Sequence, residues 1–252
     1  MLFRSSARFS AVLAARQPIV VAGLQLAAAF FGKLDPEVAI EFLVQDGDNV
    51  AAGQPLMRIA GSAQLMLAAE RSALNTLQHL TGIATVTRSY AEAIAGTDCV
   101  LLDTRKTIPG LRAIEKYAAK VGGARNHRMR LDDGILIKDN HIAAAGSIVE
   151  AVKAAKAANT GLEVQVEVDG IEQIEPALMA GADRLLCDNM SPAKLKEAVA
   201  LVGGRVPIEA SGGVRLDTIR EIASTGVDFV SVGRITQSAP AADIGLDYAL
   251  SP

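Results

Sequence analysis

The chain has 252 residues, of which 50% are hydrophobic, 4% are aromatic and none is tryptophan, and its formal net charge is -3. Such a chain can bury a sizeable core as one large or two modest domains, and its composition suits packed α/β layers better than a protein that stacks nucleic-acid bases. A pI near 5.7 argues against polyanion binding, so no nucleic-acid partner is expected. Cys99 and Cys187 give no disulfide framework and fit buried small hydrophobic residues in a reducing compartment.

The N-terminal part is expected to form a small α+β layer. The pattern predicts a short helix over 24–31 and strands within 8–21, 40–44 and 55–59. The last two strands are joined across Asp46-Gly47-Asp48. The run QDGDNVAAGQPLMRIAG around this turn resembles the hairpin of biotinyl and lipoyl carriers. It has no lysine in the turn where a carrier needs one. The apolar run from Ile19 to Phe31 is too short to cross a bilayer, so no membrane segment is expected.

A long helical pattern follows over 67–95, with a possible break at Gly82. Strands and helices then alternate. The strands are predicted at 99–102, 135–138, 163–168, 184–187, 206–209 and 229–232, with one more short strand near 121–126. The helices are predicted at 111–120, 147–158, 171–180, 192–201 and 215–224. This alternation predicts a parallel sheet covered by helices, in a complete or incomplete TIM-like barrel, with a doubly wound open sheet as the alternative.

Polar residues follow each of the predicted strands. In chain order they are Asp103-Thr104-Arg105-Lys106, Lys138, Glu167 with Asp169, Asp188-Asn189, Ser211-Gly212-Gly213 and Gly233-Arg234. Barrel active sites are built from the carboxyl ends of several strands. This row therefore predicts a single site.

Cations are concentrated between Asp103 and His141, which hold nine of the 25 Lys and Arg residues. Three of them, spaced four apart, fit a solvated helix face: Arg112, Lys116 and Lys120. Five others lie on turns and strand ends, so they cannot be explained as the solvent-exposed face of a helix: Arg105, Lys106, Arg125, Arg128 and Lys138. These residues, with His127 as a titratable neighbour, indicate an anion site.

The later strands contribute a different chemistry. Glycines at Ser211-Gly212-Gly213 and at Gly233 allow backbone N–H groups to approach a phosphate closely. Glu167 and Asp188 either are solvated strand-end acids or hold Mg²⁺, directly or through water, beside that phosphate. The composite suggests a phosphorylated, metal-bound sugar facing an acidic small molecule.

Several motifs resemble one enzyme family. They are ERSALN at 70–75, LTGIAT at 80–85, DTRKTIPGLRAIEKYA at 103–118, GGARNHR at 122–128 and IKDNH at 137–141, followed in order by EVDGIEQ, LLCDN, IEASGG and SVG. The set closely resembles quinolinate phosphoribosyltransferase, the carboxylating nicotinate-nucleotide pyrophosphorylase. Members of that family join quinolinate to phosphoribosyl pyrophosphate in de novo NAD synthesis, and they form nicotinate mononucleotide, pyrophosphate and CO₂.

The resemblance implies roles for individual residues. The quinolinate carboxylates would be held by Arg105, His127, Arg128 and Lys138, in a pocket lined by Thr104. Pyrophosphate would meet Lys106, and the ribose hydroxyls and Mg²⁺ would meet Glu167 and Asp188. The 5′-phosphate would be bound around Ser211, Gly212, Gly213, Gly233 and Arg234. The expected catalytic residues are Lys106, Lys138, Glu167 and Asp188.

The resemblance also implies an organisation. A small domain with the connecting helix over 1–97 and a barrel over 98–236 would be followed by a segment, 237–252, that returns to complete the small domain. Arg71, and Arg16 with it, would reach into a neighbouring subunit's site. The expected assembly is a homodimer with a shared active site, or a higher oligomer built from it.

Two features depart from the family pattern. The family's initial helical and acidic segment is missing, and Gln237 stands where many relatives have His, which affects the detail of the phosphate pocket. The first 34 residues are basic, rich in serine and free of acids, which superficially fits a mitochondrial transit peptide. The segment from Ala14 to Gly23 resembles the first strand region of the family's small domain. Cleavage of a transit peptide would remove this region and Arg16 with it, so we expect no cleavage and a cytoplasmic protein.

Three alternatives stay open from the sequence. A Schiff-base lyase is suggested by ILIK, which places Lys138 at a strand end; such a lysine needs an activated amine, which neighbouring arginine charges could supply. A paralogue associated with molybdenum transport would share the fold. A catalytically impaired binding protein would show a gap in the row of strand-end residues, for which only the missing N-terminal segment and Gln237 offer a hint.

Overall fold

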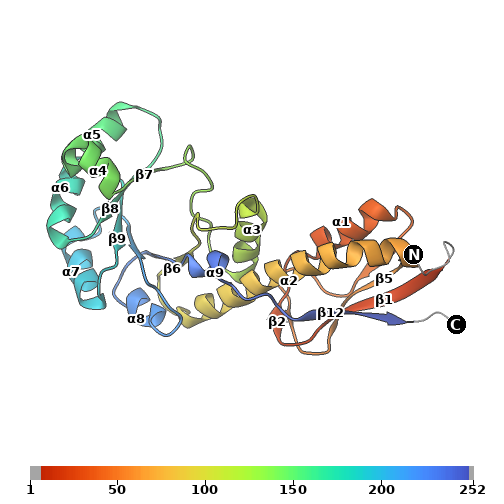
Figure 1. Cartoon of the computed structure of the whole chain (residues 1–252). Coiled ribbons are helices and arrows are strands. Elements are labelled where there is room, and N and C mark those ends of the chain that lie inside the picture. The colour runs from red at the N-terminus through yellow and green to blue at the C-terminus, as the bar shows by residue number, and fades with distance from the viewer. Residues whose placement is uncertain (1–6, 250–252) are drawn as a thin grey trace. The chain divides into compact units, whose positions relative to one another are not determined.

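The computed structural model describes residues 7–249. The first six residues of the basic N-terminal segment and the last three of the chain lie outside the described residues. The chain divides into two compact units (Figure 1). Unit 1 comprises Met1–Arg88, Ile108–Gly123 and Ile235–Pro252, and unit 2 comprises Ser89–Thr107 and Ala124–Arg234.

Unit 1 is built on an antiparallel sheet of four strands in the order β12-β1-β5-β3. The strands are β1 (Arg8–Ala15), β3 (Ala39–Phe42), β5 (Pro55–Ser62) and β12 (Ile244–Ala249). Since β12 pairs along β1, from Ser10 with Ala249 to Ala15 with Ile244, the prediction that the C-terminal segment completes the small domain is confirmed. In a separate two-stranded ladder, β2 (Ile19–Val20) lies within the predicted range 8–21, but its partner β4 (Asn49–Val50) was missed, because a two-residue strand gives no pattern.

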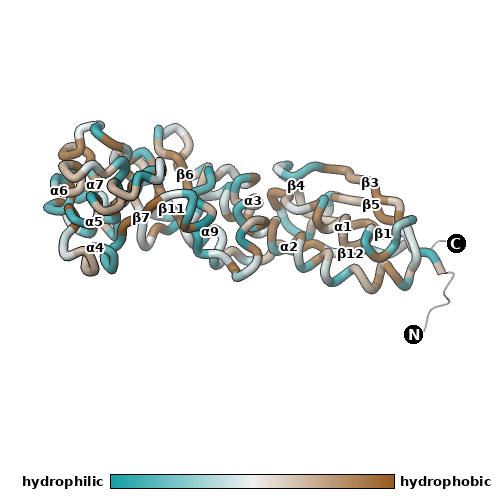
Figure 2. Tube along the Cα trace, turned by 90° about the horizontal axis from the view of Figure 1, so that it is seen from above, coloured by the Kyte–Doolittle hydropathy of each residue, from teal (hydrophilic) through white to brown (hydrophobic). Residues whose placement is uncertain are grey.

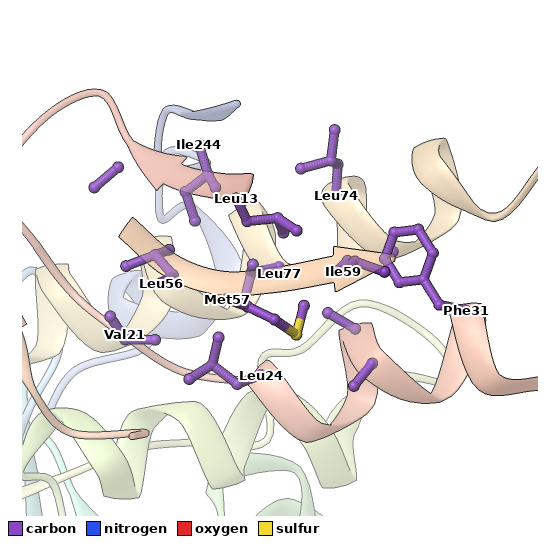
Figure 3. Packing of buried hydrophobic residues seen from close by; sticks show 14 of the residues in the cluster. Leu13, Val21, Leu24, Phe31, Leu56, Met57, Ile59, Leu74, Leu77 and Ile244 are labelled. Carbon is purple, nitrogen blue, oxygen red and sulfur yellow. The ribbon is translucent and has the colours of Figure 1, made fainter. Parts of the chain in front are cut away.

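The core of unit 1 lies between this sheet and two helices, α1 (Leu24–Leu34) and α2 (Ala63–Ala93). Figure 3 shows Met57 pointing from β5 toward Leu24 on α1, with Phe31 farther along the same helix. The side chains of Leu13, Met57 and Phe31 are at most 1% exposed. Burying each one contributes roughly 1.5–3 kcal/mol, so truncation of Phe31 to Ala would cost about 3–5 kcal/mol.

Helix α2 is continuous, so the predicted break at Gly82 is wrong. A Cβ atom on Gly82 would lie 2.0 Å from the carbonyl oxygen of Pro240 and 3.2 Å from the Cα atom of Ala241. The glycine therefore serves the close approach of a second chain segment. It costs the helix some intrinsic stability but does not interrupt it.

Helix α3 (Arg112–Gly122) groups with unit 1, so the observed division differs from the expected boundary at residue 98. Its Glu115 carboxylate lies 2.8 Å from His79 Nε2, and the Arg88 Nε–H donates to the Gly122 carbonyl at 3.1 Å. Because α3 packs on α2 in this way, Lys116 is only 1% exposed. The prediction of a solvated face through Lys116 is therefore wrong.

Unit 2 contains a six-stranded parallel sheet in the order β6-β11-β10-β9-β8-β7. The strands are β6 (Val100–Leu102), β7 (Ile135–Ile137), β8 (Val164–Val168), β9 (Arg184–Asp188), β10 (Ile208–Ser211) and β11 (Phe229–Ser231). The first strand pairs with the last, as in a barrel and unlike a doubly wound sheet. Arg125 forms a parallel bridge with Leu102 on the other side of β6. Within residues 7–249 no ladder joins this bridge to β7, so the barrel is incomplete.

The helices of unit 2 follow one another around the outside of the strands (Figure 1). They are α4 (Asp139–Ala145), α5 (Ile148–Ala157), α6 (Ile174–Met179) after the 3₁₀ turn η1 (Ile171–Gln173), α7 (Pro192–Val202), α8 (Ile219–Ala223) and the short α9 (Arg234–Gln237), whose last residues belong to unit 1. Hydrophilic and hydrophobic residues alternate along these helices, as expected of helices with one face on a sheet (Figure 2). The sequence missed α4 and α9. Within the described part of the chain, no helix has the length and apolar character needed to span a membrane.

Candidate active site

The end of β6 is fixed to the neighbouring segment by a buried carboxylate. Asp103 is 0% exposed. Its Oδ1 atom accepts the backbone N–H of His127 at 2.8 Å, and its Oδ2 atom accepts the side-chain amide of Asn126 at 2.6 Å. Asp103 therefore holds the segment that carries the predicted anion-binding residues His127 and Arg128 beside the end of β6.

Arg105 and Arg128 form a half-buried pair of cations. Burial, and then the positive charge of Arg105, hold the pKa of the Arg128 guanidinium below its usual range. One Arg128 nitrogen donates to the Gly134 carbonyl at 3.0 Å, which fixes the side chain. Two cations held close in a partly desolvated position favour an anionic ligand between them.

Lys106 and Thr104 lie over Gly233, at the end of β11. A Cβ atom at position 233 would lie 2.8 Å from Lys106 Cδ and 3.4 Å from Thr104 Oγ1. The Thr104 hydroxyl accepts the backbone N–H of Lys106 at 3.0 Å. The first and last strands of the sheet thus bring the DTRKT turn and the SVG turn together, as the row of strand ends predicted.

Lys138 and Glu167, at the ends of β7 and β8, form an ion pair. The Glu167 side chain is 13% exposed and the Lys138 side chain 43% exposed, so the cation has access to solvent. The backbone N–H of Lys138 donates to His141 Nδ1 at 3.0 Å. His141, for which the sequence suggested no role, therefore fixes the start of α4 and with it Lys138.

The ends of β9 and β10 are joined through Asn189. Its side-chain amide donates to Asp188 Oδ2 at 2.6 Å, and its backbone N–H donates to the Ser211 carbonyl at 2.9 Å. Gly212 has a φ of 89°, and a Cβ atom there would lie 2.2 Å from Asn189 Oδ1 and 2.8 Å from Asn189 N. Only glycine fits this turn, which leaves Asp188 and Ser211 side by side.

These carboxylates fit a magnesium ion only together with a ligand. Within the residues that the structure describes, no cluster of three or more His, Cys, Asp or Glu side chains could hold a metal by itself. Mg²⁺ is commonly bound by one or two carboxylates, several waters and substrate phosphates. Glu167 and Asp188, on adjacent strands β8 and β9, supply the protein's share of such a site.

A polar layer inside the barrel was missed from the sequence. Glu209 on β10 is 0% exposed, and its Oε2 atom lies 2.8 Å from Gln165 Nε2, 2.8 Å from an Arg184 nitrogen and 3.3 Å from His127 Nε2. Barrel interiors usually hold branched apolar residues at such positions. The sequence did carry a signal, because Glu209 precedes Ser211 by two residues and must share its face of the strand.

The other four predicted site residues are divided between the two units. Gly213 and Arg234 are exposed in unit 2, after β10 and β11. Arg71 and Arg16 belong to unit 1, where Arg71 is exposed on α2 and Arg16 pairs with Asp247 at 2.5 Å. Unit 2 by itself therefore brings together the cations, carboxylates and glycine turns that the strand ends predicted.

The arrangement has two chemically different sides. Arg105, Arg128 and Lys138 can hold the carboxylates of a small acid, while the turns at Gly212 and Gly233 form the predicted phosphate site. Glu167 and Asp188 lie on strands between these groups. Such a site can hold an acidic molecule and a phosphorylated, metal-bound partner at once.

Comparisons with known proteins agree with this chemistry. The chain matches the family profiles for the quinolinate phosphoribosyl transferase N-terminal domain over residues 1–81 and C-terminal domain over residues 83–247. It is 42% identical over 240 residues to the nicotinate-nucleotide pyrophosphorylase [carboxylating] of Mycobacterium leprae, covering 92% of this chain and 84% of the relative. It is 40% identical over 242 residues to the probable enzyme of that name from Bacillus subtilis, covering 96% and 84%.

A solved structure gives the same result. The nicotinate-nucleotide pyrophosphorylase from Francisella tularensis superposes with a TM-score of 0.95 at 38% identity, covering 98% of this chain and 88% of that one. The two profile matches together span nearly the whole chain. The chain belongs to the quinolinate phosphoribosyltransferase family.

Proposed function

We propose that this chain transfers the phosphoribosyl group of phosphoribosyl pyrophosphate to quinolinate and that it decarboxylates the product to nicotinate mononucleotide, with release of pyrophosphate and CO₂. The reaction is the one named for its relatives, which it matches over 92–96% of its own length. This is a step of NAD biosynthesis.

The observation that carries the proposal is the division of the site by charge. Quinolinate has two carboxylates on adjacent ring carbons, and the three cations proposed to receive them are Arg105, Arg128 and Lys138. Each charge-assisted hydrogen bond is worth about 1.5–3 kcal/mol. A monocarboxylate would leave part of this positive charge unmatched, so the site favours a dianionic acid.

The proposed roles of the other residues follow from their positions. Lys106, which lies over Gly233, would meet the pyrophosphate, and Thr104 would line the pocket beside it. The turns at Ser211-Gly212-Gly213 and Gly233-Arg234 would bind the 5′-phosphate. Glu167 and Asp188 would bind the ribose hydroxyls and Mg²⁺, which when bound neutralises charge on the departing pyrophosphate.

The chemistry requires orientation more than covalent catalysis. As the bond to pyrophosphate breaks, the anomeric carbon gains oxocarbenium character, and Lys106 stabilises the charge that leaves. Arg105 and Arg128 aim the pyridine nitrogen at that carbon. Once alkylated, the nitrogen is positive, and the adjacent ring carbon can hold the electron pair left by CO₂ before it takes up a proton from solvent.

The Schiff-base lyase suggested by ILIK finds no support in the position of Lys138. Its ammonium is paired with the Glu167 carboxylate. A Schiff-base lysine needs a neutral amine, which an apolar pocket or a neighbouring cation provides and a partner carboxylate does not. In the proposed transferase, the same pair of side chains, Lys138 and Glu167, contributes to substrate binding.

The proposal extends to the assembly and its location. A homodimer in which Arg71 and Arg16 reach the partner's site follows from the family resemblance, and gel filtration with light scattering tests it. The proposed location is the cytoplasm, whereas plant relatives are named chloroplastic or mitochondrial. Fractionation of the source cells decides between these compartments.

Calorimetric titration with quinolinate and with nicotinate tests the substrate class. The three cations predict that quinolinate binds at least tenfold more tightly, because the second carboxylate adds at least one charge-assisted hydrogen bond worth about 1.5 kcal/mol. Equal affinity for the two acids, in protein shown to be folded, would move the assignment to a paralogue with another substrate.

A further inference from the structure

The carboxylate of Glu209 is the central acceptor of the polar layer inside the barrel. It lies on β10 between Leu186 of β9 and Phe229 of β11, two residues before Ser211. A buried carboxylate is costly unless hydrogen bonds and an opposite charge compensate it. Gln165, Arg184 and His127 provide this compensation, all at the same oxygen, Oε2.

The hydrogen bonds of His127 assign its tautomer. Its Nδ1 atom accepts the backbone N–H of Arg128 at 2.7 Å, so Nδ1 carries a lone pair and the ring proton is on Nε2. Nε2, which carries this proton, lies 3.3 Å from Glu209 Oε2, within ion-pair distance. A proton on Nδ1 would instead face the N–H of Arg128, with two donors 2.7 Å apart.

Both ring nitrogens of His127 are thus engaged within the protein. The backbone N–H of His127 is held as well, by Asp103 Oδ1 at 2.8 Å. The segment that ends in Arg128 is therefore fixed by one carboxylate at its main chain and by another at its imidazole. Only 14% of the His127 side chain is exposed.

We infer that Glu209 is a positioning residue for quinolinate binding: it holds the Nε2–H of His127 and, through that ring, the main chain of Arg128. This inference rests on the proposed function and deepens it. His127 then supplies orientation to the site, and the ring N–H that would otherwise meet a quinolinate carboxylate is given to Glu209. Arg184, whose guanidinium lies 3.9 Å from the centre of the Phe229 ring, balances the charge of Glu209.

Nitrogen NMR of the whole protein with ¹⁵N-labelled histidine tests the contact without substrate. The chain has three histidines, and His127→Ala assigns the signal. We expect His127 to show an unprotonated Nδ1 and a protonated Nε2. Glu209→Gln should change this pattern, because one amide oxygen cannot serve three donors. His141, whose Nδ1 accepts the N–H of Lys138, is the internal reference and should not change.

Kinetics separate positioning from general stability. Glu209→Gln should raise the KM for quinolinate about tenfold and leave the KM for phosphoribosyl pyrophosphate within about twofold, since a single charge-assisted bond is affected. In a His127→Ala background the same substitution should change the quinolinate KM less than twofold, because the two residues act as one unit. Glu175→Gln, which breaks an exposed ion pair with Arg205, is the matched control.

The outcomes are distinguishable. A wild-type His127 with its proton on Nδ1 would overturn the inference, even if Glu209→Gln failed to fold. Equal effects of Glu209→Gln with and without His127 would also overturn it. If the wild type gave the expected NMR pattern but did not turn over quinolinate, the contact would stand, and both the proposed function and the role in quinolinate binding would fall.

Discussion

Lys138 and Glu167 neutralise each other across the ends of neighbouring strands. Lys138 follows β7 and Glu167 lies near the end of β8, and the register that pairs Ile137 with Val166 brings them to one level. One is expected to bind a carboxylate of quinolinate and the other the ribose. An ammonium group has three N–H donors, so Lys138 can meet a ligand carboxylate while it stays beside Glu167, and Glu167 competes with that carboxylate for its charge.

Substitution of Glu167 should separate binding from turnover. Glu167→Gln releases Lys138, and because a partly exposed ion pair is worth about 0.2–1 kcal/mol, quinolinate alone should bind up to about fivefold more tightly. Turnover should fall at least about 100-fold, since the proposed ligand of the ribose and Mg²⁺ is lost. Calorimetry and steady-state rates measure the two effects. Glu150→Gln, which breaks an exposed pair with Lys153, should change neither.

Substitution of Arg105 should affect one substrate only. Arg105→Ala removes at least one of the proposed charge-assisted hydrogen bonds to quinolinate, about 1.5–3 kcal/mol, so quinolinate should bind roughly 10- to 200-fold more weakly. The affinity for phosphoribosyl pyrophosphate should stay within about threefold. Separate titrations measure both. Arg130→Ala, at a side chain 72% exposed and paired with Asp132, is the control. Similar losses for the two substrates would contradict the assignment.

Protonation of Glu209 should destabilise the folded protein in acid. Burial alone would raise the pKa of its carboxyl, but the hydrogen bond from His127 and the charge of Arg184 outweigh it, and the pKa lies below its usual value of 4.5. The stabilisation is therefore present above that value and disappears as the pH falls through the folded-state pKa. The free energy of unfolding of the wild type should fall more steeply than that of Glu209→Gln below about pH 4.5. Parallel urea-denaturation curves at each pH would contradict this.

Both cysteines should be unreactive in the folded protein. Burial, with the charge of Asp228 as a lesser cause, raises the pKa of Cys99 to about 12, and burial raises the pKa of Cys187 to about 12. The thiolate fraction at pH 8 is then roughly 10³-fold lower than for a free thiol. Ellman's reagent should label neither residue in the native state and both after denaturation. Rapid labelling of the native protein would show that these sites open.

Much of unit 2 could be predicted from the sequence because its strands are apolar and end on polar residues. All six predicted strands exist, and the row from Asp103 to Arg234 lies at the carboxyl ends of a parallel sheet. The prediction that the cysteines are buried is also confirmed, at 7% exposure for Cys99 and 1% for Cys187. These features depend on local patterns, which a single sequence records.

The misses depend on contacts between distant segments. Gly82 looks like a helix break until the chain at Pro240 is seen to pass beside it. Lys116 looks solvated because its helical spacing does not say that α3 packs on α2. The role of Glu209 depends on Gln165 of β8, Arg184 of β9 and His127, and no spacing along the chain shows that these residues meet.

The measurement that tests the account most directly is a turnover assay with the intact chain, quinolinate, phosphoribosyl pyrophosphate and Mg²⁺, and with nicotinate as a parallel substrate. We predict nicotinate mononucleotide and CO₂ in equal amounts from quinolinate, and no product from nicotinate under the same conditions. Product from nicotinate without CO₂, or no product from either acid in protein shown to be folded, would contradict the account.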